Sequence, residues 1–498
     1  MAVSRVALAR WQTLPRLKSI GFLAVGRLSI VLASVVSVRL MTTVLSPTEV
    51  GRYSVLLAFT MWFSLTLVSP AGNYINRRFL EWVGRAVLWH QLRHYAGLLV
   101  IIACFAAGTS YGVRNTGLLG LPICGDVLIL CVTGILIFLT ANTILADFLN
   151  VLGHRGLYVL YASATAWLGL AASVLFTHAL AHTAELWIAG QIAGWAVLSV
   201  VGYLSLRHCV AEARIDVPAH SLHEQGLWAF AWPLVISTSL YWFQVQGYRI
   251  ELEHWTGAAA VGVLTTGLLL GANPIATVET LLSEYFKPQY SQAITCSDKQ
   301  TQEIAWREMA EKFLTLLIPT TVLVGFSGSF MAAILVGPSF RSVASLIAWG
   351  ALVEFFRAIN SLYGLAAYTC FQTRAMLRPA LVGVAIVLLA IVPLSHWNLY
   401  MGTGAALALG MAGSTVYLRV SLHRIFTTTI GWGCVIRAIF YSTPTGVGLI
   451  VARTIIAHPA PLQAAAVLSL AGALTLGAQA LLNRQMTIAA TPMVKGLV

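Results

Sequence analysis

Long apolar runs separated by short polar breaks recur along almost the whole chain. They predict membrane-spanning helices at 19–44, 53–76, 94–112, 127–150, 156–177 and 185–206, and, after a polar stretch, at 227–250, 257–285, 313–336, 343–370, 376–395, 400–418, 441–457 and 462–482. Apolar runs of about 20 residues are typical of helices that cross a bilayer. The pattern therefore predicts an all-α polytopic membrane protein with about fourteen transmembrane helices.

The predicted helices fall into two groups of six, followed by a pair. We expect a cytoplasmic interfacial segment at 1–18, an N-terminal lobe at 19–206 (helices 1–6), a cytoplasmic linker at 207–226, a C-terminal lobe at 227–424 (helices 7–12), and, at 425–498, a cytoplasmic amphipathic segment, helices 13 and 14 and a C-terminal tail. Because each lobe has an even number of helices, the two are expected to be parallel repeats about an axis along the membrane normal.

A short sequence similarity between the lobes supports this repeat. Residues 44–53 (VLSPTEVGRY) lie between the first two helices and resemble residues 255–264 (WTGAAAVGVL) between the seventh and eighth. The dipeptide Val50-Gly51 in the first turn matches Val261-Gly262 in the second.

The first of these turns also carries a helix-start signal. Ser46 is suited to the N-cap of the second helix, Pro47 to its first position, and Glu49 stands three residues after the cap. The plain interpretation is a helix start at the outer interface.

Composition agrees with a membrane protein and indicates its orientation. The chain is 58% hydrophobic and 9% charged, with a formal net charge of +13. The predicted inner loops carry most of the Lys and Arg residues, above all those at 77–93 and 287–312, so we expect both termini in the cytoplasm. This bias explains the basic charge without a nucleic-acid partner.

Several classes of chemistry have no support in the sequence. There is no GxxxxGK[ST] phosphate-binding loop, no HExxH or GxSxG motif and no paired-carboxylate constellation, and the seven cysteines are scattered without metal-ligand spacing. The longest predicted outer loop, 113–126, is short for an outer active site. We therefore expect no enzyme activity, no cofactor and no metal site.

Charged residues inside predicted spans are the first candidates for a functional site, because each costs roughly 2.5–3.5 kcal/mol at a helix centre. Arg27 lies about 14 Å into its helix from Lys18, close to the middle of the membrane. Arg357 lies in the middle of helix 10, where an ion pair with Glu354 on the same face is the alternative to a cavity role. Arg39 and Arg249 are weaker cavity candidates near helix ends.

Polar and aromatic residues suggest where sugars would bind. Trp242, Gln246 and Arg249 follow the spacing i, i+4 and i+7, which puts them on one face of an α-helix; an interfacial aromatic belt is an equal alternative. Asn73 and Asn76 either line a portal or solvate a helix end. The acids that stand as candidates for ion coupling, or for ordinary polar pairs inside the bundle, are Asp147, Glu279, Glu284 and Glu354.

An ordered set of segments resembles the Wzx-type polysaccharide flippases of the multidrug/oligosaccharidyl-lipid/polysaccharide superfamily. The segments are RLMTTVLSPTEVGRYSVLLAF (39–59), LNVLGHRGLYVL (149–160), GAAAVGVLTTG (257–267), YFKPQYSQA (285–293) and FQTRAMLRP (371–379). The second turn, GAAAVG, departs from the first in lacking its Pro and Glu.

The resemblance implies two six-helix lobes in a bacterial inner membrane and a cavity that opens alternately to either side. It implies a polyprenyl-diphosphate-linked oligosaccharide as cargo, suggests an acidic, xanthan-type repeat unit, and makes a polysaccharide polymerase and export machinery expected partners alongside membrane lipids. Arg27 and Arg357, with Arg249 and Arg39 less directly, would hold the diphosphate. The leading hypothesis is thus a flippase for exopolysaccharide assembly. A cation-coupled multidrug exporter of the same superfamily is the alternative, and a lipid-linked oligosaccharide polymerase or ligase a more distant one.

Overall fold

A computed structural model of the chain describes residues 16–116, 125–212, 227–296, 299–369, 376–423 and 430–494. In this described part every regular element is a helix, and thirteen helices are long and apolar enough to cross a membrane. The seventh predicted span is not among the thirteen, although the chain there is continuously helical. The predicted fold, an all-α membrane protein with about fourteen spans, is confirmed.

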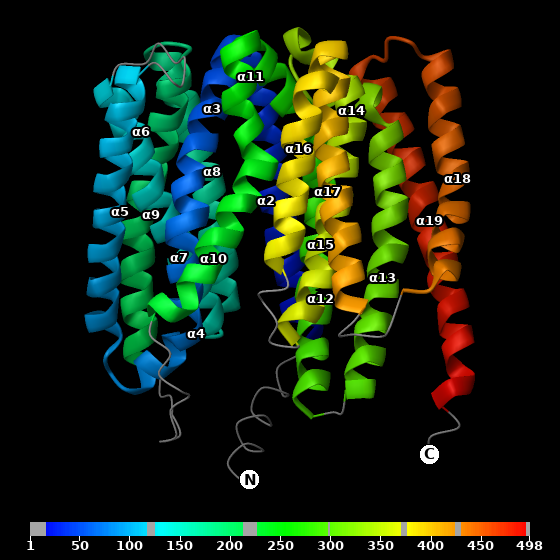
Figure 1. Cartoon of the computed structure of the whole chain (residues 1–498), viewed down its shortest axis with the longest axis horizontal. Coiled ribbons are helices and arrows are strands. Elements are labelled where there is room, and N and C mark those ends of the chain that lie inside the picture. Colours follow the sequence, from blue (N-terminus) through cyan, green and yellow to red (C-terminus); the bar gives the residue numbers. More distant parts are fainter. Residues whose placement is uncertain are drawn as a thin grey trace. The chain divides into compact units, whose positions relative to one another are not determined.

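The N-terminal helices form the first six spans (Figure 1). They are α2 (Arg16–Val44), α3 (Pro47–Phe63) continued by η1 (Ser64–Val68) and α4 (Ser69–Gly84), α5 (Leu88–Thr116), α6 (Gly125–Gly134) continued by η2 (Ile135–Leu139) and α7 (Thr140–Val151), α8 (Arg155–Ala179) and α9 (Ala184–Glu212). The segments η1 and η2 are π-helical turns inside otherwise α-helical spans.

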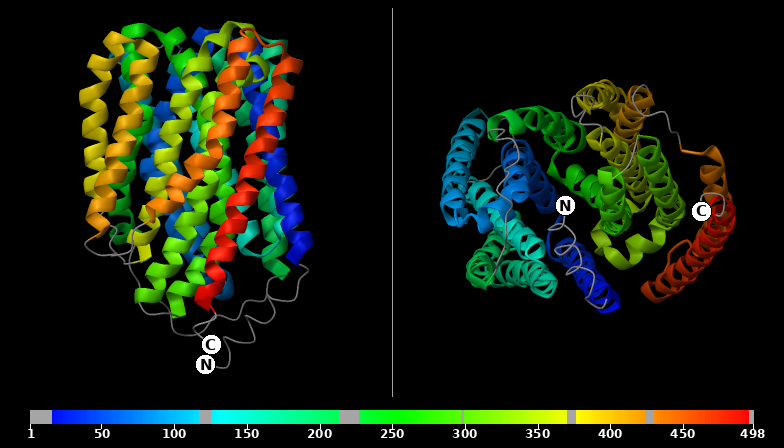
Figure 2. Two further views of the ribbon diagram at one scale, coloured as in Figure 1. Left: turned by 90° about the vertical axis from the view of Figure 1, so that its right-hand side faces the viewer. Right: turned by 90° about the horizontal axis from the view of Figure 1, so that it is seen from below.

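The C-terminal helices supply the remaining spans. They are α10 (Leu227–Trp242) continued by the π-helical η3 (Phe243–Gly247) and α11 (Tyr248–Thr256), α12 (Ala258–Cys296), α13 (Lys299–Phe326), α14 (Gly328–Leu335), the 3₁₀ turn η4 (Pro338–Val343), α15 (Ala344–Thr369), α16 (Leu377–Trp397), α17 (Leu399–His423), α18 (Trp432–Ile455) and α19 (Pro461–Val494). The last two lie side by side (Figure 2).

The chain folds into two compact units that exchange a helix segment. One unit comprises Met1–Leu45 and Phe59–Val235, and the other comprises Ser46–Ala58 and Ile236–Val498. The first turns of α3 thus belong with the C-terminal helices, although the predicted lobe 19–206 assigned them to the N-terminal half. Residues 1–15 of the predicted segment 1–18 lie outside the described part. In the predicted segment 425–498, the same holds for residues 425–429 and 495–498.

Several helices run further than the hydropathy pattern predicts. The α9 helix continues to Glu212, so residues 207–212 are helical and the predicted linker is shorter than 207–226; residues 213–226 lie outside the described part. The α12 helix continues to Cys296, and α13 begins at Lys299 instead of 313. The pair Arg307–Glu311, one turn apart at 3.0 Å, lies on such an extension. Hydropathy marks where the apolar span ends, whereas a charged helix end can continue beyond it.

The turn between α2 and α3 has the predicted cap. The backbone N–H of Glu49 donates to the Ser46 hydroxyl at 3.3 Å, and α3 begins at Pro47. This satisfies one of the backbone donors that a helix start leaves without an intrahelical partner.

The first turns of α3 and α12 pack backbone against backbone. A Cβ atom added at Gly51 would lie 1.7 Å from the carbonyl oxygen of Ala258, and one added at Gly262 would lie 2.1 Å from that of Pro47. One turn further, the hydroxyls of Ser54 and Thr265 share a hydrogen bond of 2.9 Å. The glycines that the repeat matches therefore touch each other's helices.

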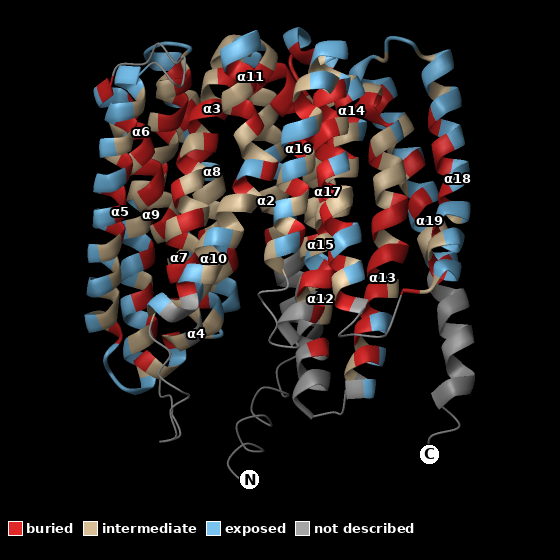
Figure 3. Ribbon diagram, viewed as in Figure 1, coloured by how far each residue is buried: buried red, intermediate tan, exposed pale blue. Residues whose placement is uncertain are grey.

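Each unit has its own buried core (Figure 3). In the N-terminal unit the rings of Phe79 and Phe148 stack at 4.0 Å and join α4 to α7. In the C-terminal unit Phe330 and Leu449 are buried in a cluster that holds α18 and α19 against α14. Many apolar side chains on the outer helices stay exposed, as expected for surfaces in contact with lipid.

Candidate functional site

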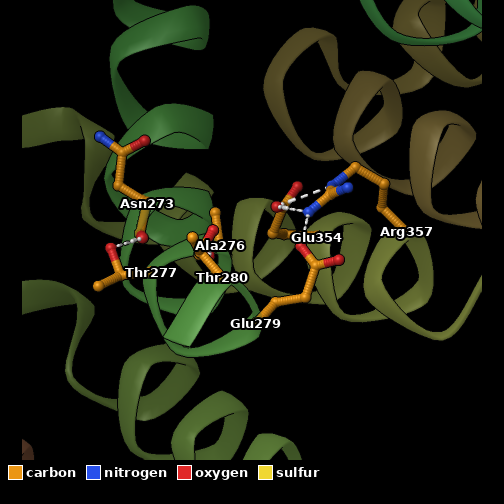
Figure 4. Close-up of polar contacts among 7 residues, drawn as sticks. All are labelled: Asn273, Ala276, Thr277, Glu279, Thr280, Glu354 and Arg357. Carbon is orange, nitrogen blue, oxygen red and sulfur yellow. Dashed lines mark hydrogen bonds and ion pairs between the residues drawn. The ribbon is translucent and has the colours of Figure 1, made fainter. Parts of the chain in front are cut away.

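The C-terminal unit contains a buried ion triad made by α12 and α15 (Figure 4). The Arg357 guanidinium binds Glu354 on its own helix through Nε at 2.8 Å and Nη2 at 2.7 Å. Its Nη2 also pairs with Glu279 on α12. Both carboxylates are 8% exposed. The helical spacing of three residues explains the first pair, and the packing of α15 along α12 supplies the second.

The charge of this triad differs from that of a free arginine. With two carboxylates and one guanidinium ionised, the group carries a net charge of −1. The local pair with Glu354, which sequence reasoning held open as an alternative, is present in the structure. Arg357 is therefore a compensated charge in this conformation and does not present a free cation.

Two small cavities flank the triad. One, of about 210 Å³, is lined by Glu279, Ser283 and Ser361 together with apolar residues of α13. The other, of about 180 Å³, is lined by Arg357, Ser361 and polar residues of α10 and η3. Each has room for several water molecules but not for an oligosaccharide. Each of the two cavities is thus lined by one residue of the triad, and Ser361 lines both.

The second cavity has a polar wall. It is lined by Ser237, Thr238, Tyr241, Gln244, Asn360 and Ser414 among others. The Asn360 Oδ1 atom is buried without a hydrogen-bond partner in the described structure. A buried amide oxygen in this state is costly unless water or an ion contacts it. Sequence reasoning missed Asn360 and Gln244, whose amides were visible in the spans but gave no sign that α10 and α15 meet.

The neighbouring turns of α12 add further polar groups to the view in Figure 4. Thr277 donates its hydroxyl to the carbonyl of Asn273 at 2.8 Å, and Thr280 donates to that of Ala276 at 2.8 Å. These hydroxyls are satisfied by their own helix. The ionisable chemistry of this region is therefore concentrated in the triad.

In the N-terminal unit, Arg27 lies on α2 and is half-buried. Its Nη2 donates to the hydroxyl of Tyr158 on α8 at 3.1 Å, a partner 131 residues away that no local pattern indicates. This hydrogen bond joins α2 to α8 and positions the guanidinium. Arg39, near the C-terminal end of α2, is also half-buried.

The other polar candidates of this unit form one pair. Asn76 on α4 donates its amide to Asp147 on α7 at 3.0 Å, which makes Asp147 part of a polar contact between helices. Asn73 is exposed. The structure brings Asn76 and Asp147 together, while Asn73 stands apart from that contact.

A π-helical turn interrupts the face predicted for the seventh span. The π-helical turn η3 lies between Trp242 and Arg249, so the α-helical spacing that aligned them with Gln246 is interrupted. Trp242 is 5% exposed and donates its indole N–H to the carbonyl of Ala58 at 2.8 Å. Arg249 is 7% exposed and lies over the Tyr248 ring at 5.8 Å.

Two further candidates, Gln246 and Glu284, belong to the C-terminal unit. The Gln246 Oε1 atom is buried and has no hydrogen-bond partner within the described structure, so it remains open to a ligand. Glu284 lies on α12, but its side chain is outside the described part.

Most of the chain is similar in fold to solved structures of membrane transport proteins. A structure of the lipid II flippase MurJ, in an inward closed conformation, matches with a TM-score of 0.66 at 12% sequence identity, covering 93% of this chain and 99% of that chain. The MATE transporter VcmN of Vibrio cholerae matches with a TM-score of 0.57 at 14% identity, covering 83% and 96%. An inward-facing MATE family multidrug resistance transporter of the MOP superfamily gives 0.54 at 15%, covering 81% and 98%.

At these identities the likeness establishes the fold. No family model and no curated protein sequence matches this chain.

Proposed function

We propose that the protein is a flippase that moves a polyprenyl-diphosphate-linked oligosaccharide from the inner to the outer leaflet of a bacterial inner membrane by alternating access. The observation that carries this proposal is the length over which the fold agrees with MurJ. The MurJ match covers 93% of this chain, whereas the two MATE matches cover 83% and 81%. The difference is about the size of α18 and α19, of 24 and 34 residues.

The charges support an anionic cargo. Arg27 is a half-buried intramembrane guanidinium that donates to the hydroxyl of Tyr158, and the planar guanidinium group suits the oxygens of a diphosphate. With an inside-negative potential, each negative charge carried outward gains about 2.3 kcal/mol per 100 mV. We place both termini in the cytoplasm and expect the product to pass to a polysaccharide polymerase and export machinery.

In this proposal the triad has a coupling role. Protonation of Glu279 or Glu354 would neutralise a net charge of −1 and weaken the hold on Arg357. Arg357 would then bind the diphosphate only in a second conformation, in which the triad is open, and not in the conformation described here. Uptake and release of one proton would in this way bias the equilibrium between two arrangements of α12 and α15.

The test is outward translocation of a fluorescent polyprenyl-diphosphate oligosaccharide in proteoliposomes. We expect Arg27→Ala to lower the rate about tenfold or more, since a charge-assisted hydrogen bond contributes roughly 1.5–3 kcal/mol, and Arg27→Lys to recover part of it. Arg437→Ala is the matched control, because this exposed arginine of α18 donates to a carbonyl of its own helix. Undiminished transport by Arg27→Ala in folded protein would remove the proposed role of Arg27.

A multidrug exporter is the second candidate, and the triad is the observation that favours it. A buried group with net charge −1 beside a polar cavity suits a cationic substrate better than a diphosphate. The same proteoliposomes would be loaded with a cationic dye. Dye efflux by the wild type, abolished in Glu279→Gln and without movement of the lipid-linked sugar, would decide for the exporter.

A further inference from the structure

A groove lies within the N-terminal unit among α5, α7 and α9, helices that can be followed in Figure 1. Its volume is about 680 Å³, and its walls are mainly apolar, with Leu92, Ala96 and Leu99 from α5 and Ile144 and Phe148 from α7. The walls formed by α5 and α9 are joined at one end by an edge-to-face contact between Trp89 and Tyr203, whose ring centroids are 5.6 Å apart. None of the residues used above for the proposed cargo site lines this groove.

The mouth of the groove is basic. Arg93 on α5 and Arg207 on α9 line it from facing helices, and both side chains are exposed. No acidic side chain is among the described residues that line it. Two guanidinium groups at the open end of an apolar slot form a site for a molecule with an anionic head and a hydrocarbon tail.

The depth of the groove fits one leaflet. From Arg93 at the mouth to Leu99 at the inner end, α5 rises about 9 Å, which lies within one half of a hydrocarbon core of roughly 30 Å. An acyl chain of a lipid in that leaflet spans this distance. A path for a cargo that crosses the membrane would have to continue through the second leaflet, and the lining residues end before it.

We propose that this groove binds an anionic phospholipid, with the phosphate between Arg93 and Arg207 and one acyl chain along Ala96 and Leu99 against α7. The lipid is a resident ligand of this unit and not the translocated molecule. The assignment does not depend on the proposed function and holds equally for a flippase or an exporter.

The test is native mass spectrometry of the purified full-length protein with phosphatidylglycerol and phosphatidylcholine of equal chain length. We expect the wild type to retain phosphatidylglycerol roughly thirtyfold better, since each of the two basic residues near the surface contributes about fivefold, or about 1 kcal/mol. The double variant Arg93→Gln/Arg207→Gln should lose this preference. Arg85→Gln should keep it, because Arg85 is exposed at the same end of α5 but pairs with Glu81 at 3.1 Å and does not line the groove.

A second pair of variants tests the acyl slot. Ala96→Trp fills the groove and should lower retention of both lipids, whereas Cys104→Trp, at an exposed position further along α5 that does not line it, should not. Thermal unfolding in detergent checks that each variant is folded. Equal retention of phosphatidylglycerol by the double variant, or displacement of that lipid by a polyprenyl phosphate at equal concentration, would overturn the proposal, the latter assigning the groove to the carrier lipid.

Discussion

Gly51 and Gly262 are equivalent positions of the internal repeat, and each lies against the backbone of the other's helix. Gly262 approaches the carbonyl oxygen of Pro47 and the amide of Gly51, while Gly51 approaches the carbonyl of Ala258. The hydrogen bond between Ser54 and Thr265 joins two further residues separated by the repeat distance of 211. The two halves of the sequence thus meet through corresponding residues at the starts of α3 and α12.

This contact predicts that a single methyl group at either glycine is destabilising. A Cβ atom in Gly51→Ala or Gly262→Ala would meet backbone atoms that cannot rotate away. We expect a loss of about 1–3 kcal/mol, as for overpacked sites, seen as a lower midpoint of thermal unfolding in detergent. Gly108→Ala on α5 is the control, because open space surrounds it; an equal loss there would contradict the explanation.

The hydrogen bond beside the glycines predicts an energetic coupling. Ser54→Ala and Thr265→Val each remove one partner of a buried pair, and the double variant removes both. We expect a coupling energy of about 0.5–1.5 kcal/mol in a double-mutant cycle on unfolding in detergent. Strictly additive effects would show that the two hydroxyls contribute only by donating to the carbonyls of Val50 and Val261 on their own helices, the alternative acceptors of their single protons.

The triad predicts that the stability of the protein depends strongly on Arg357. Arg357→Ala leaves two buried carboxylates without their partner and should cost about 3–5 kcal/mol. Adding Glu279→Gln and Glu354→Gln should restore most of the stability, because no buried charge then remains. Thermal unfolding compares the three forms. An Arg357→Ala protein as stable as the wild type would mean that the pairs contribute nothing to folding.

Tyr158 predicts an indirect effect on transport. Its hydroxyl holds Arg27, so Tyr158→Phe keeps the cation and removes one positioning contact. We expect a loss of roughly threefold to tenfold in the translocation rate, in line with one hydrogen bond of about 1 kcal/mol. In the Arg27→Ala background the same change should have no further effect. Independent losses would indicate that Tyr158 contributes through another contact.

Glu253 predicts a dependence of stability on pH. It lies beyond the predicted span 227–250, and burial raises the pKa of its carboxyl, an effect partly offset by the charges of His254 and Arg52. A raised folded-state pKa favours folding below the ordinary carboxyl pKa, and this advantage is lost as the pH rises through the raised value. Glu253→Gln should therefore gain stability relative to the wild type as the pH rises over that range, measured by thermal unfolding. Glu308→Gln, at an exposed position, is the control.

Hydropathy and turn chemistry were sufficient to predict the helical fold and one detail of it. Apolar runs located the spans because the bilayer requires them, and Ser46 with Pro47 located the start of α3 because capping is a local interaction. The charged extensions of α12 and α13 were missed because nothing in their composition requires a membrane.

The candidate site was predictable only where its contacts are local. The Arg357–Glu354 pair follows from a spacing of three residues, whereas the third member, Glu279, comes from a helix 78 residues away. Arg27 and Tyr158 meet for the same non-local reason. The expected common face of Trp242, Gln246 and Arg249 lost its geometric basis because a π-helical turn is not visible in a pattern of apolar and polar residues.

The three π-helical turns found among the described residues have a consequence for comparing this chain with others. A π-turn holds one residue more than an α-turn, so each of the segments Ser64–Val68, Ile135–Leu139 and Phe243–Gly247 acts as a one-residue insertion absorbed without a loop. A relative that lacks the extra residue would align with a single gap there. With that gap in place, the side chains past the π-turn keep their neighbours. An alignment without the gap would pair residues that point about 100° apart around the helix axis, and these residues would face different neighbours.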